Sequence, residues 1–278
     1  MDGFLSIKEA LQVYINGCIA KSKTPAWQLF LKGIMAGMLI GLGAAASSVA
    51  GHSITNVGLS RLAIGAVFPV GLMLTILLGA ELFTGDCLAC VSVFDKKTKW
   101  SFFFKLLVIV YIGNFVGAVI LTGITYAGGQ WDYSGGLLGA YAIKVALAKV
   151  NVGFVQGVCS GILCNVLVCG TVFMAVCAKE VAGKLLAIFF GVFAFAVSGY
   201  EHCVANMYYI TAGFFAKLNP SYAEVAMNTY GITQAQLAEI SLSGYASNLI
   251  SVTLGNIIGG AVLVGALVYY MSKSKKEA

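Results

Sequence analysis

The chain has 278 residues, of which 59% are hydrophobic and only 10% are charged, with a net charge of +6. A soluble domain of this length normally carries about 25% charged residues, so the composition excludes an ordinary water-soluble protein and indicates a membrane protein. The eight cysteines lie mostly in apolar segments, where we expect them to act as small free hydrophobic residues rather than as a disulfide framework.

Residues 1–26 predict an amphipathic helix that lies on the membrane surface. The apolar positions recur with helical spacing: Phe4, Leu5, Ile7, Ala10, Leu11, Tyr14, Ile15, Cys18 and Ile19. No secretory signal is recognisable in this segment.

Six stretches are long and apolar enough to span a bilayer as helices, which takes roughly 20 residues each. They cover residues 27–49, 61–94, 101–127, 150–177, 183–215 and 245–271, the second and fifth being interrupted. An even number of spans places both termini on one side, which then carries thirteen of the 17 basic residues. The positive-inside rule predicts that this side is cytoplasmic and that the chain lies in the cell (inner) membrane.

An internal repeat is indicated by a constant offset of 120 residues. It places Gly33, Gly37 and Gly41 on Gly153, Gly157 and Gly161, and it places Glu81 on Glu201. In the third spans Gly113-Asn114 corresponds to Gly255-Asn256 at an offset of 142, which we attribute to an additional loop with a short helix within 217–243. Three spans per half require an inverted repeat. We therefore expect an all-α membrane protein with a single domain over 1–278, a first repeat at 27–127 and a second at 150–271.

The two interruptions carry ionisable residues at membrane depth, where such residues are expensive and usually functional. Glu81 and Glu201 are predicted to be structural, accepting hydrogen bonds from backbone N–H groups that the broken helices free. Asp86 is interpreted as a cap of the resumed helix. His202 has leucine as its repeat equivalent, and the pseudo-two-fold axis sets it opposite Thr84.

Other polar and apolar residues allow two interpretations each. Lys149 either snorkels at a helix end or attracts anions into a vestibule. Asn165 and Asn206 either join helices by hydrogen bonds or line a wet path. Phe68, Leu72 and Phe195, each taken alone, favour packing over a pore.

Five short sequence motifs closely resemble those of the formate/nitrite transporter family. They are Ala-Glu-Leu-Phe-Thr-Gly (80–85), Tyr-Ile-Gly-Asn-Phe-Val-Gly (111–117), Gly-Ile-Leu-Cys-Asn-Val-Leu-Val-Cys (161–169), Ser-Gly-Tyr-Glu-His-Cys-Val-Ala-Asn-Met (198–207) and Asn-Leu-Ile-Ser-Val-Thr-Leu-Gly-Asn-Ile-Ile-Gly-Gly (248–260). The resemblance implies a homopentamer with one pore per subunit and an aquaporin-like topology.

Residue roles follow from that resemblance by position. His202 is similar to the central pore histidine, Thr84 to its partner and Lys149 to a vestibule lysine, while Asn165 and Asn206 match pore-lining asparagines. Two apolar constrictions are implied at Phe68, Leu72, Leu82, Val168 and Phe195.

The expected substrates are small monovalent weak-acid anions such as hydrosulfide, formate and nitrite. Tyr200, Cys203, Thr211 and Ser251 depart from the formate-channel pattern and look more like the hydrosulfide-channel branch, with a formate or nitrite channel as the alternative. An aquaporin-like channel for neutral solutes is expected to carry an Asn-Pro-Ala motif at each break, and neither motif is present in the sequence. A metalloenzyme would have to build its site on Cys87-x2-Cys90 and His202-Cys203, but no second ligand pair with matching spacing is present in the sequence. We expect no enzyme activity, cofactor, metal or nucleic-acid partner.

Overall fold

A computed structural model describes residues 3–273. Within that range six helical segments are long and apolar enough to cross a membrane. They are α2 (Ala26–Gly51), α3 and α4 (together Val57–Leu77), α7 (Trp100–Ala127), α9 (Phe154–Cys177), α10 (Val181–Ser198) and the continuous segment Leu242–Ser272. The last comprises α14 (Leu242–Ile257), the π-helix η3 (Ile258–Ala266) and α15 (Leu267–Ser272). The six predicted spans are therefore confirmed. Lys275 and Lys276, which contribute to the predicted charge bias, lie outside the described residues.

Both predicted interruptions are present as short non-helical turns. The first separates α4 (Val70–Leu77) from α5 (Phe83–Asp86), which continues through η1 (Cys87–Ala89) into α6 (Cys90–Phe94). The second separates α10 from α11 (Cys203–Ala216). Each turn begins at a glycine with positive φ, +66° at Gly79 and +73° at Gly199, a conformation that residues with a Cβ rarely adopt.

Among residues 3–273, four further helices lie outside the spans: α1 (Ile7–Ser22), α8 (Leu137–Val150), α12 (Pro220–Tyr230) and α13 (Gln234–Glu239). The sequence predicts one short helix within 217–243, and the structure has two there. It does not predict α8, whose 14 residues are too short to read as a span.

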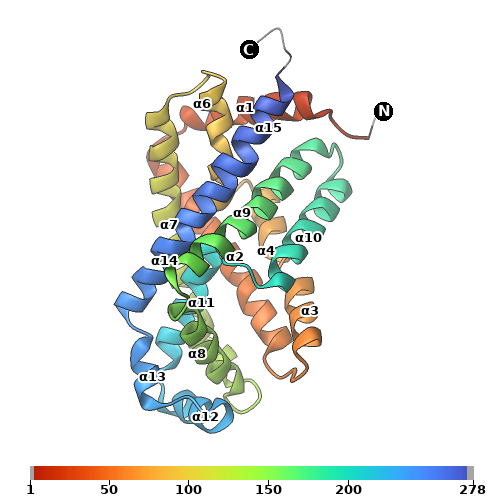
Figure 1. Cartoon of the computed structure of the whole chain (residues 1–278). Helices are drawn as coiled ribbons and strands as arrows, with labels where there is room; N and C mark the ends of the chain where they lie inside the picture. Colours follow the sequence, from red (N-terminus) through yellow and green to blue (C-terminus); the bar gives the residue numbers. More distant parts are fainter. Residues whose placement is uncertain (1–2, 274–278) are drawn as a thin grey trace.

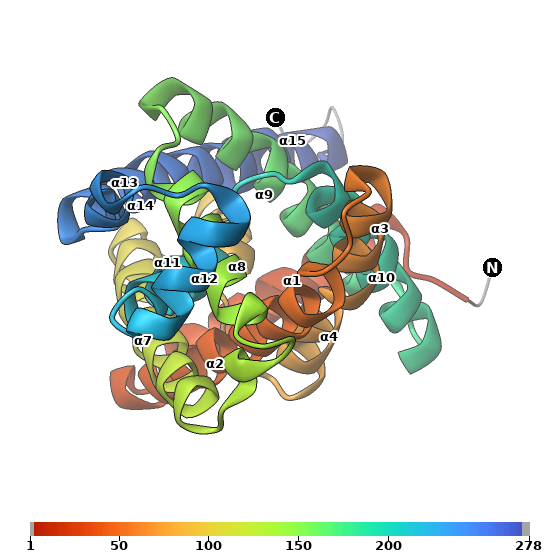
Figure 2. The same cartoon turned by 90° about the horizontal axis from the view of Figure 1, so that it is seen from below.

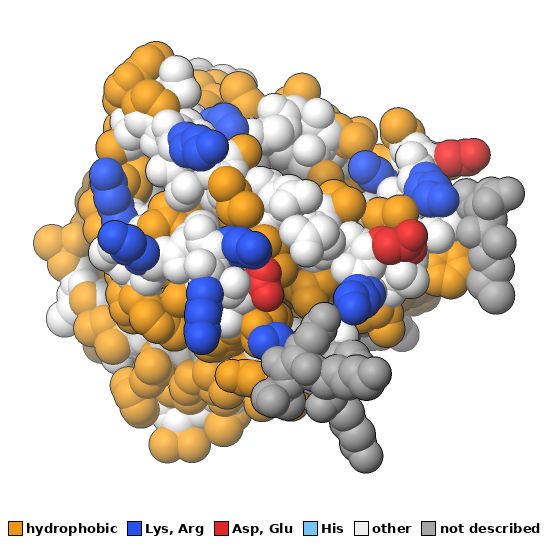
Figure 3. Space-filling view, turned by 90° about the horizontal axis from the view of Figure 1, so that it is seen from above, with side chains coloured by type: hydrophobic (Ala, Val, Ile, Leu, Met, Phe, Trp, Pro, Cys, Tyr) orange, Lys and Arg blue, Asp and Glu red, His pale blue; other side chains and the backbone are white. Residues whose placement is uncertain are grey.

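The helices arrange themselves around the two breaks. α1, α6 and α15 lie at one end of the molecule, and α12 and α13 at the other (Figure 1). Seen along that axis, α3 lies beside α10 on one side, while α2 packs on α7 and α9 on α14 (Figure 2). Lysine and arginine side chains gather on the end that holds α1 and α15 (Figure 3), as the charge bias along the chain predicts.

The helix predicted at the N-terminus is confirmed, but its apolar face is not free for lipid. Ser6 and Glu9 form a capping box at its start. Ala10, Leu11 and Ile15 are buried against the rest of the chain, where α1 packs on α9, α6 and α15. The helix is thus part of the folded unit. Its buried face packs against other helices of the protein, where the sequence predicted contact with the membrane surface.

Close helix contacts correct the predicted repeat register. A Cβ on Gly33 would meet the Val110 carbonyl oxygen at 3.0 Å, and a Cβ on Gly161 would meet the Val252 carbonyl oxygen at 2.8 Å. Val252 is the counterpart of Val110 at the expected offset of 142, so Gly33 corresponds to Gly161, at an offset of 128 (33 to 161). The match of Gly33 with Gly153 is therefore wrong.

The breaks themselves keep the predicted offset of 120. An offset of 128 before the breaks and 120 at them (a difference of 8) means that the first half is longer between Gly33 and Glu81. The additional residues are spread over the end of α2, the connection after it (52–56, against 178–180 after α9) and the span that precedes the break. The glycine triplets mislead because a Gly-x3-Gly pattern matches itself at every fourth residue.

The tightest of these contacts predicts a stability difference within α7. A Cβ on Gly117 would overlap the Ile34 carbonyl oxygen and lie 2.9 Å from the Met38 nitrogen, whereas Gly123 has nothing within 4 Å. Gly117→Ala should lower the free energy of unfolding in detergent by about 1–3 kcal/mol, because two backbones must separate. Gly123→Ala, the matched control, should raise it by roughly 0.5–1 kcal/mol through helix propensity. Equal effects of the two substitutions would contradict the packing.

Candidate functional site

Each break is held by an asparagine from the neighbouring long helix. The Asn114 side chain donates to the carbonyl oxygens of Gly33 (2.8 Å) and Glu81 (3.0 Å) and accepts from the Phe83 N–H (3.0 Å). Asn256 repeats the pattern on Gly161 (2.8 Å), Glu201 (3.0 Å) and the Cys203 N–H (2.9 Å). Both asparagines are fully buried. Backbone groups left open by a broken helix must find partners in a membrane, and these amides supply them.

The carboxylates of the breaks therefore do a different job from the predicted one. The Glu81 carboxylate is 2.5 Å from the Lys21 ammonium, which reaches it from α1, and 3.7 Å from that of Lys32. The expectation that it accepts backbone N–H groups is wrong, since Asn114 takes the freed amide. Asp86 is no cap either, because α5 begins three residues earlier; it binds Lys21 at 2.6 Å.

The second break carries the equivalent ion pair. Glu201 lies 2.5 Å from Lys149, whose side chain is 18% exposed, and it accepts a 2.6 Å hydrogen bond from Asn206. Asn206 also donates to Asn248 at 2.8 Å, and Asn248 donates to the Lys149 carbonyl at 2.7 Å. Lys149 is thus held by a carboxylate rather than snorkelling freely, and Asn206 joins helices.

His202 and Thr84 connect the two breaks. His202 is the N-cap of α11, and its Nδ1 accepts a hydrogen bond from the Ala205 N–H at 3.2 Å. Its Nε2 lies 3.0 Å from the Thr84 hydroxyl oxygen. A backbone N–H can only donate, so Nδ1 carries no proton and the neutral ring is protonated at Nε2, which donates to Thr84. A second proton on the ring, at Nδ1, would place two donors opposite each other and break the hydrogen bond from the Ala205 N–H.

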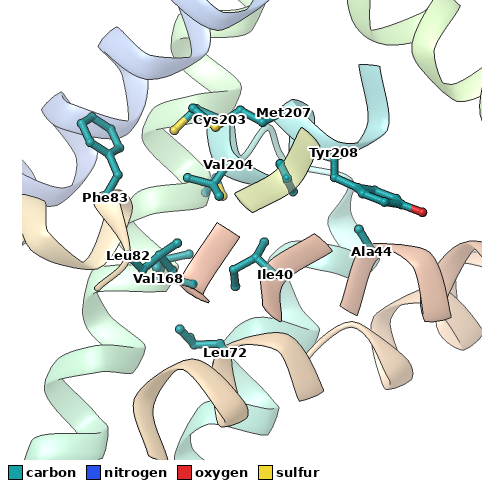
Figure 4. Close-up of a cluster of buried hydrophobic side chains, with 14 of the residues drawn as sticks. Ile40, Ala44, Leu72, Leu82, Phe83, Val168, Cys203, Val204, Met207 and Tyr208 are labelled. Atoms are coloured by element: carbon teal, nitrogen blue, oxygen red, sulfur yellow. The ribbon is translucent and has the colours of Figure 1, made fainter. Parts of the chain in front are cut away.

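Apolar side chains pack beside this pair. The Phe195 ring stacks on the imidazole with 5.8 Å between centroids, and Phe68 meets Phe195 edge-on at 5.5 Å. Leu72, Leu82 and Val168 lie together in the same buried cluster (Figure 4). All five residues of the predicted constrictions are at most 5% exposed. The structure thus places Phe195 against the imidazole and Phe68 against Phe195, while the two constrictions stay a prediction.

Asn165 lies behind the Thr84 backbone. It donates to the Thr84 carbonyl at 3.1 Å and to the Asn256 carbonyl at 2.6 Å, and the Cys169 thiol also reaches the Thr84 carbonyl at 3.2 Å. Of its two interpretations, the hydrogen bonds favour a role in joining helices.

Four residues of this site were not singled out from the sequence. Asn114 and Asn256 were visible as a matched pair but were used only to align the repeat. Lys21 and Asn248 were hidden among ordinary surface and helix positions. An offset of 128, which relates Lys21 to Lys149, was the signal that could have found Lys21.

A cavity of about 380 Å³ opens toward the first break from the end that holds α1. Its wall includes Lys21, Lys32, Glu81 and Asp86, and it closes on the apolar residues Leu72 and Leu82. Charged groups at a mouth, followed by a dry segment and a neutral hydrogen-bonding ring, can select a small solute that forms hydrogen bonds but sheds its water.

Comparison with known proteins gives a consistent family. The family model described as "Formate/nitrite transporter" matches residues 8–270. Formate channel FocA of Haemophilus influenzae is 30% identical over 271 residues, covering 96% of this chain and 94% of that protein. The "Probable formate transporter" of Methanothermobacter thermautotrophicus is 33% identical, covering 90% of each chain.

Two solved structures have the same fold. A structure described as "Pentameric formate channel with formate bound" superimposes with a TM-score of 0.78 at 33% identity, covering 88% of this chain and 97% of that one. A structure described as "FNT family ion channel" gives 0.78 at 30% identity, covering 94% and 98%. The six-span fold and the channel or transporter class follow, and the chain belongs to the formate/nitrite transporter family.

Proposed function

We propose that the protein is a pentameric channel for small monovalent anions of weak acids, and that formate is its substrate. The observation that carries the proposal is the hydrogen bond between His202 and Thr84, enclosed by apolar side chains where the two breaks meet. The formate channels among the relatives support the choice of substrate class and of assembly.

The dry segments dictate how an anion crosses. Removing water from an isolated carboxylate costs many kcal/mol, and Leu72, Leu82 and Phe195 offer no hydrogen bond in return. The neutral imidazole provides no full positive charge. It holds the Thr84 oxygen, whose own hydroxyl hydrogen can then be donated to a passing solute. A monovalent anion that has taken up one proton crosses as a neutral acid, so flux should rise as the pH falls.

Formate is preferred over hydrosulfide because the named relatives are formate channels and transporters. Two of the residues that suggested the hydrosulfide branch bond to backbone: the Thr211 hydroxyl donates to the Met207 carbonyl at 2.5 Å, and the Ser251 hydroxyl to the Asn248 carbonyl at 3.0 Å. The Cys203 side chain is fully buried. The Thr211 and Ser251 hydroxyls are thus engaged within the protein, and hydrosulfide remains the alternative substrate.

Orientation and localisation are part of the same proposal. The lysine-rich end with α1 and α15 faces the cytoplasm, so both termini are cytoplasmic and the chain is a multi-pass protein of the inner membrane. The first break then opens inward and the second outward, within a single transmembrane domain.

The histidine can be separated from its capping role. His202→Asn should keep the N-cap on Ala205, because asparagine is a good cap, but should lose the reach to Thr84. His202→Phe should lose both. We expect both variants to reduce formate flux into proteoliposomes at least about tenfold, with His202→Asn keeping wild-type thermal stability. Wild-type formate flux in His202→Asn would contradict the proposal, because it would show that the imidazole serves only as the N-cap of α11.

Whether Leu82 forms a constriction is tested by shortening its side chain. Leu82→Val and Leu82→Ala should raise flux and loosen selectivity in a panel of formate, hydrosulfide, nitrite and chloride, because they remove buried methyl groups from the dry segment. Leu138→Val, which removes a similar group from α8, is the matched control and should change neither. The panel on the wild type also ranks the substrates. Chloride passing as readily as formate would refute the weak-acid proposal.

Assembly is tested independently of transport. The purified protein in detergent should have the mass of five copies by native mass spectrometry. A monomer or dimer that still transports formate would contradict the proposed pentamer without contradicting the proposed substrate.

A further inference from the structure

The two breaks carry ion-pair sites that the internal repeat relates. Lys21, Glu81 and Asp86 form the first-break site, and Lys149, Glu201 and Asn206 the second-break site. In both, a lysine at the last turn of a preceding helix lies 2.5 Å from the glutamate of the break. Lys21 stands one residue before the end of α1, and Lys149 one residue before the end of α8. The two lysines are related by the offset of 128 that also relates α2 to α9. The two glutamates are related by the offset of 120 that applies at the breaks.

The third member of the two sites differs by one chemical group. Asp86 and Asn206 are equivalent: the Asp86 N–H donates to the Leu82 carbonyl at 2.8 Å, and the Asn206 N–H to the His202 carbonyl at 2.9 Å. Asparagine and aspartate have nearly the same shape. The first-break site therefore has an additional carboxyl group where the second-break site has a neutral amide, and the amide donates to its glutamate at 2.6 Å.

The additional carboxyl group leaves a charge that the site does not balance. Asp86 is 2% exposed and Glu81 is 5% exposed, and both face the single Lys21 ammonium. If both acids are ionised, two buried negative charges meet one positive charge. Lys32 is 3.7 Å from Glu81, but its side chain is 43% exposed and is screened by solvent. Buried charge of this kind is costly, and a proton taken up by the carboxyl pair removes it.

One oxygen of the pair is open for that proton. Asp86 Oδ2 is buried and has no hydrogen-bond partner among residues 3–273, while Oδ1 is taken by Lys21. Asp86 and Glu81 also line the cavity that opens at the α1 end. The other titratable or charged groups that face the pair are Tyr14, Cys18 and Lys21 of α1, Lys32 of α2, Cys87 of η1 and Cys169 of α9.

We propose that Asp86 and Glu81, joined by Lys21, form a proton-binding site at one mouth of the pore, and that its proton admits anions by cancelling one negative charge. The inference rests on the proposed anion transport and assigns a regulatory site to it. The equilibrium is the binding of one H⁺ by the carboxylate pair. Loss of this proton as the pH rises leaves a net negative charge that repels an anion from the cavity.

The second-break site has no counterpart to this switch, because its amide cannot ionise. The two mouths of one subunit therefore respond differently to pH. This asymmetry is superimposed on the protonation of the substrate itself, which is the same for every variant of the protein.

Equilibrium exchange of labelled formate tests the switch, because equal pH on both sides makes the orientation of the protein in the liposome irrelevant. Asp86→Asn turns the first-break site into a copy of the second. The ratio of Asp86→Asn to wild-type exchange should rise with pH to about tenfold, the effect of roughly one partly screened charge on the local anion concentration. Glu180→Gln, an exposed carboxyl at the start of α10, should give a ratio of one at every pH. A ratio for Asp86→Asn that is the same at every pH would overturn the proposal, because a purely structural role changes the rate uniformly.

Infrared difference spectroscopy tests the proton without transport. The wild type should show the C=O stretch of a protonated carboxyl group that disappears as the pH rises, and Asp86→Asn should lose this band while Glu180→Gln keeps it. A wild type without the band sinks the proton site. If the band is present but the wild type does not exchange formate, the proposed function fails and the proton site stands.

Discussion

The structure depends on one constraint, which is that a helix broken inside a membrane must find partners for its open backbone groups. Asn114 and Asn256 meet that constraint with the same three hydrogen bonds each, to a carbonyl on the first helix of the half, to the glutamate carbonyl of the break and to the N–H that starts the next helix. Each side chain thereby ties three segments together at one buried point.

The remaining features of the site follow from those two ties. With the backbone satisfied by amides, Glu81 and Glu201 are available for lysine, and each break acquires an ion pair at its mouth. The same ties aim the first residues of α5 and α11 toward one another, so that Thr84 and His202 meet at 3.0 Å. The first ion pair lines the cavity at the α1 end, and the neutral ring of His202 lies against Phe195.

The inverted repeat explains both the likeness of the two halves and their differences. Positions that bear on packing are the same in both halves, as Gly113 and Gly255 show by their contacts with equivalent backbone. Positions beside the breaks differ: leucine in one half corresponds to His202, and aspartate to Asn206. A symmetric scaffold therefore carries an asymmetric path. Apolar packing tolerates such exchanges because each replaces a side chain without moving the backbone.

The sequence by itself determined the six spans, the two breaks, the inverted repeat and the family, because apolar length, glycine and charge placement are local properties of the chain. It also named His202 and Thr84 as opposite one another. Only the tertiary structure decided the register of the first spans, the burial of α1 and the partners of the glutamates. Lys21 and Glu81 are 60 residues apart in the chain (21 to 81), and Gly-x3-Gly repeats match in several registers. Which backbones touch, and which cation reaches which carboxylate, depends on how the helices pack in three dimensions.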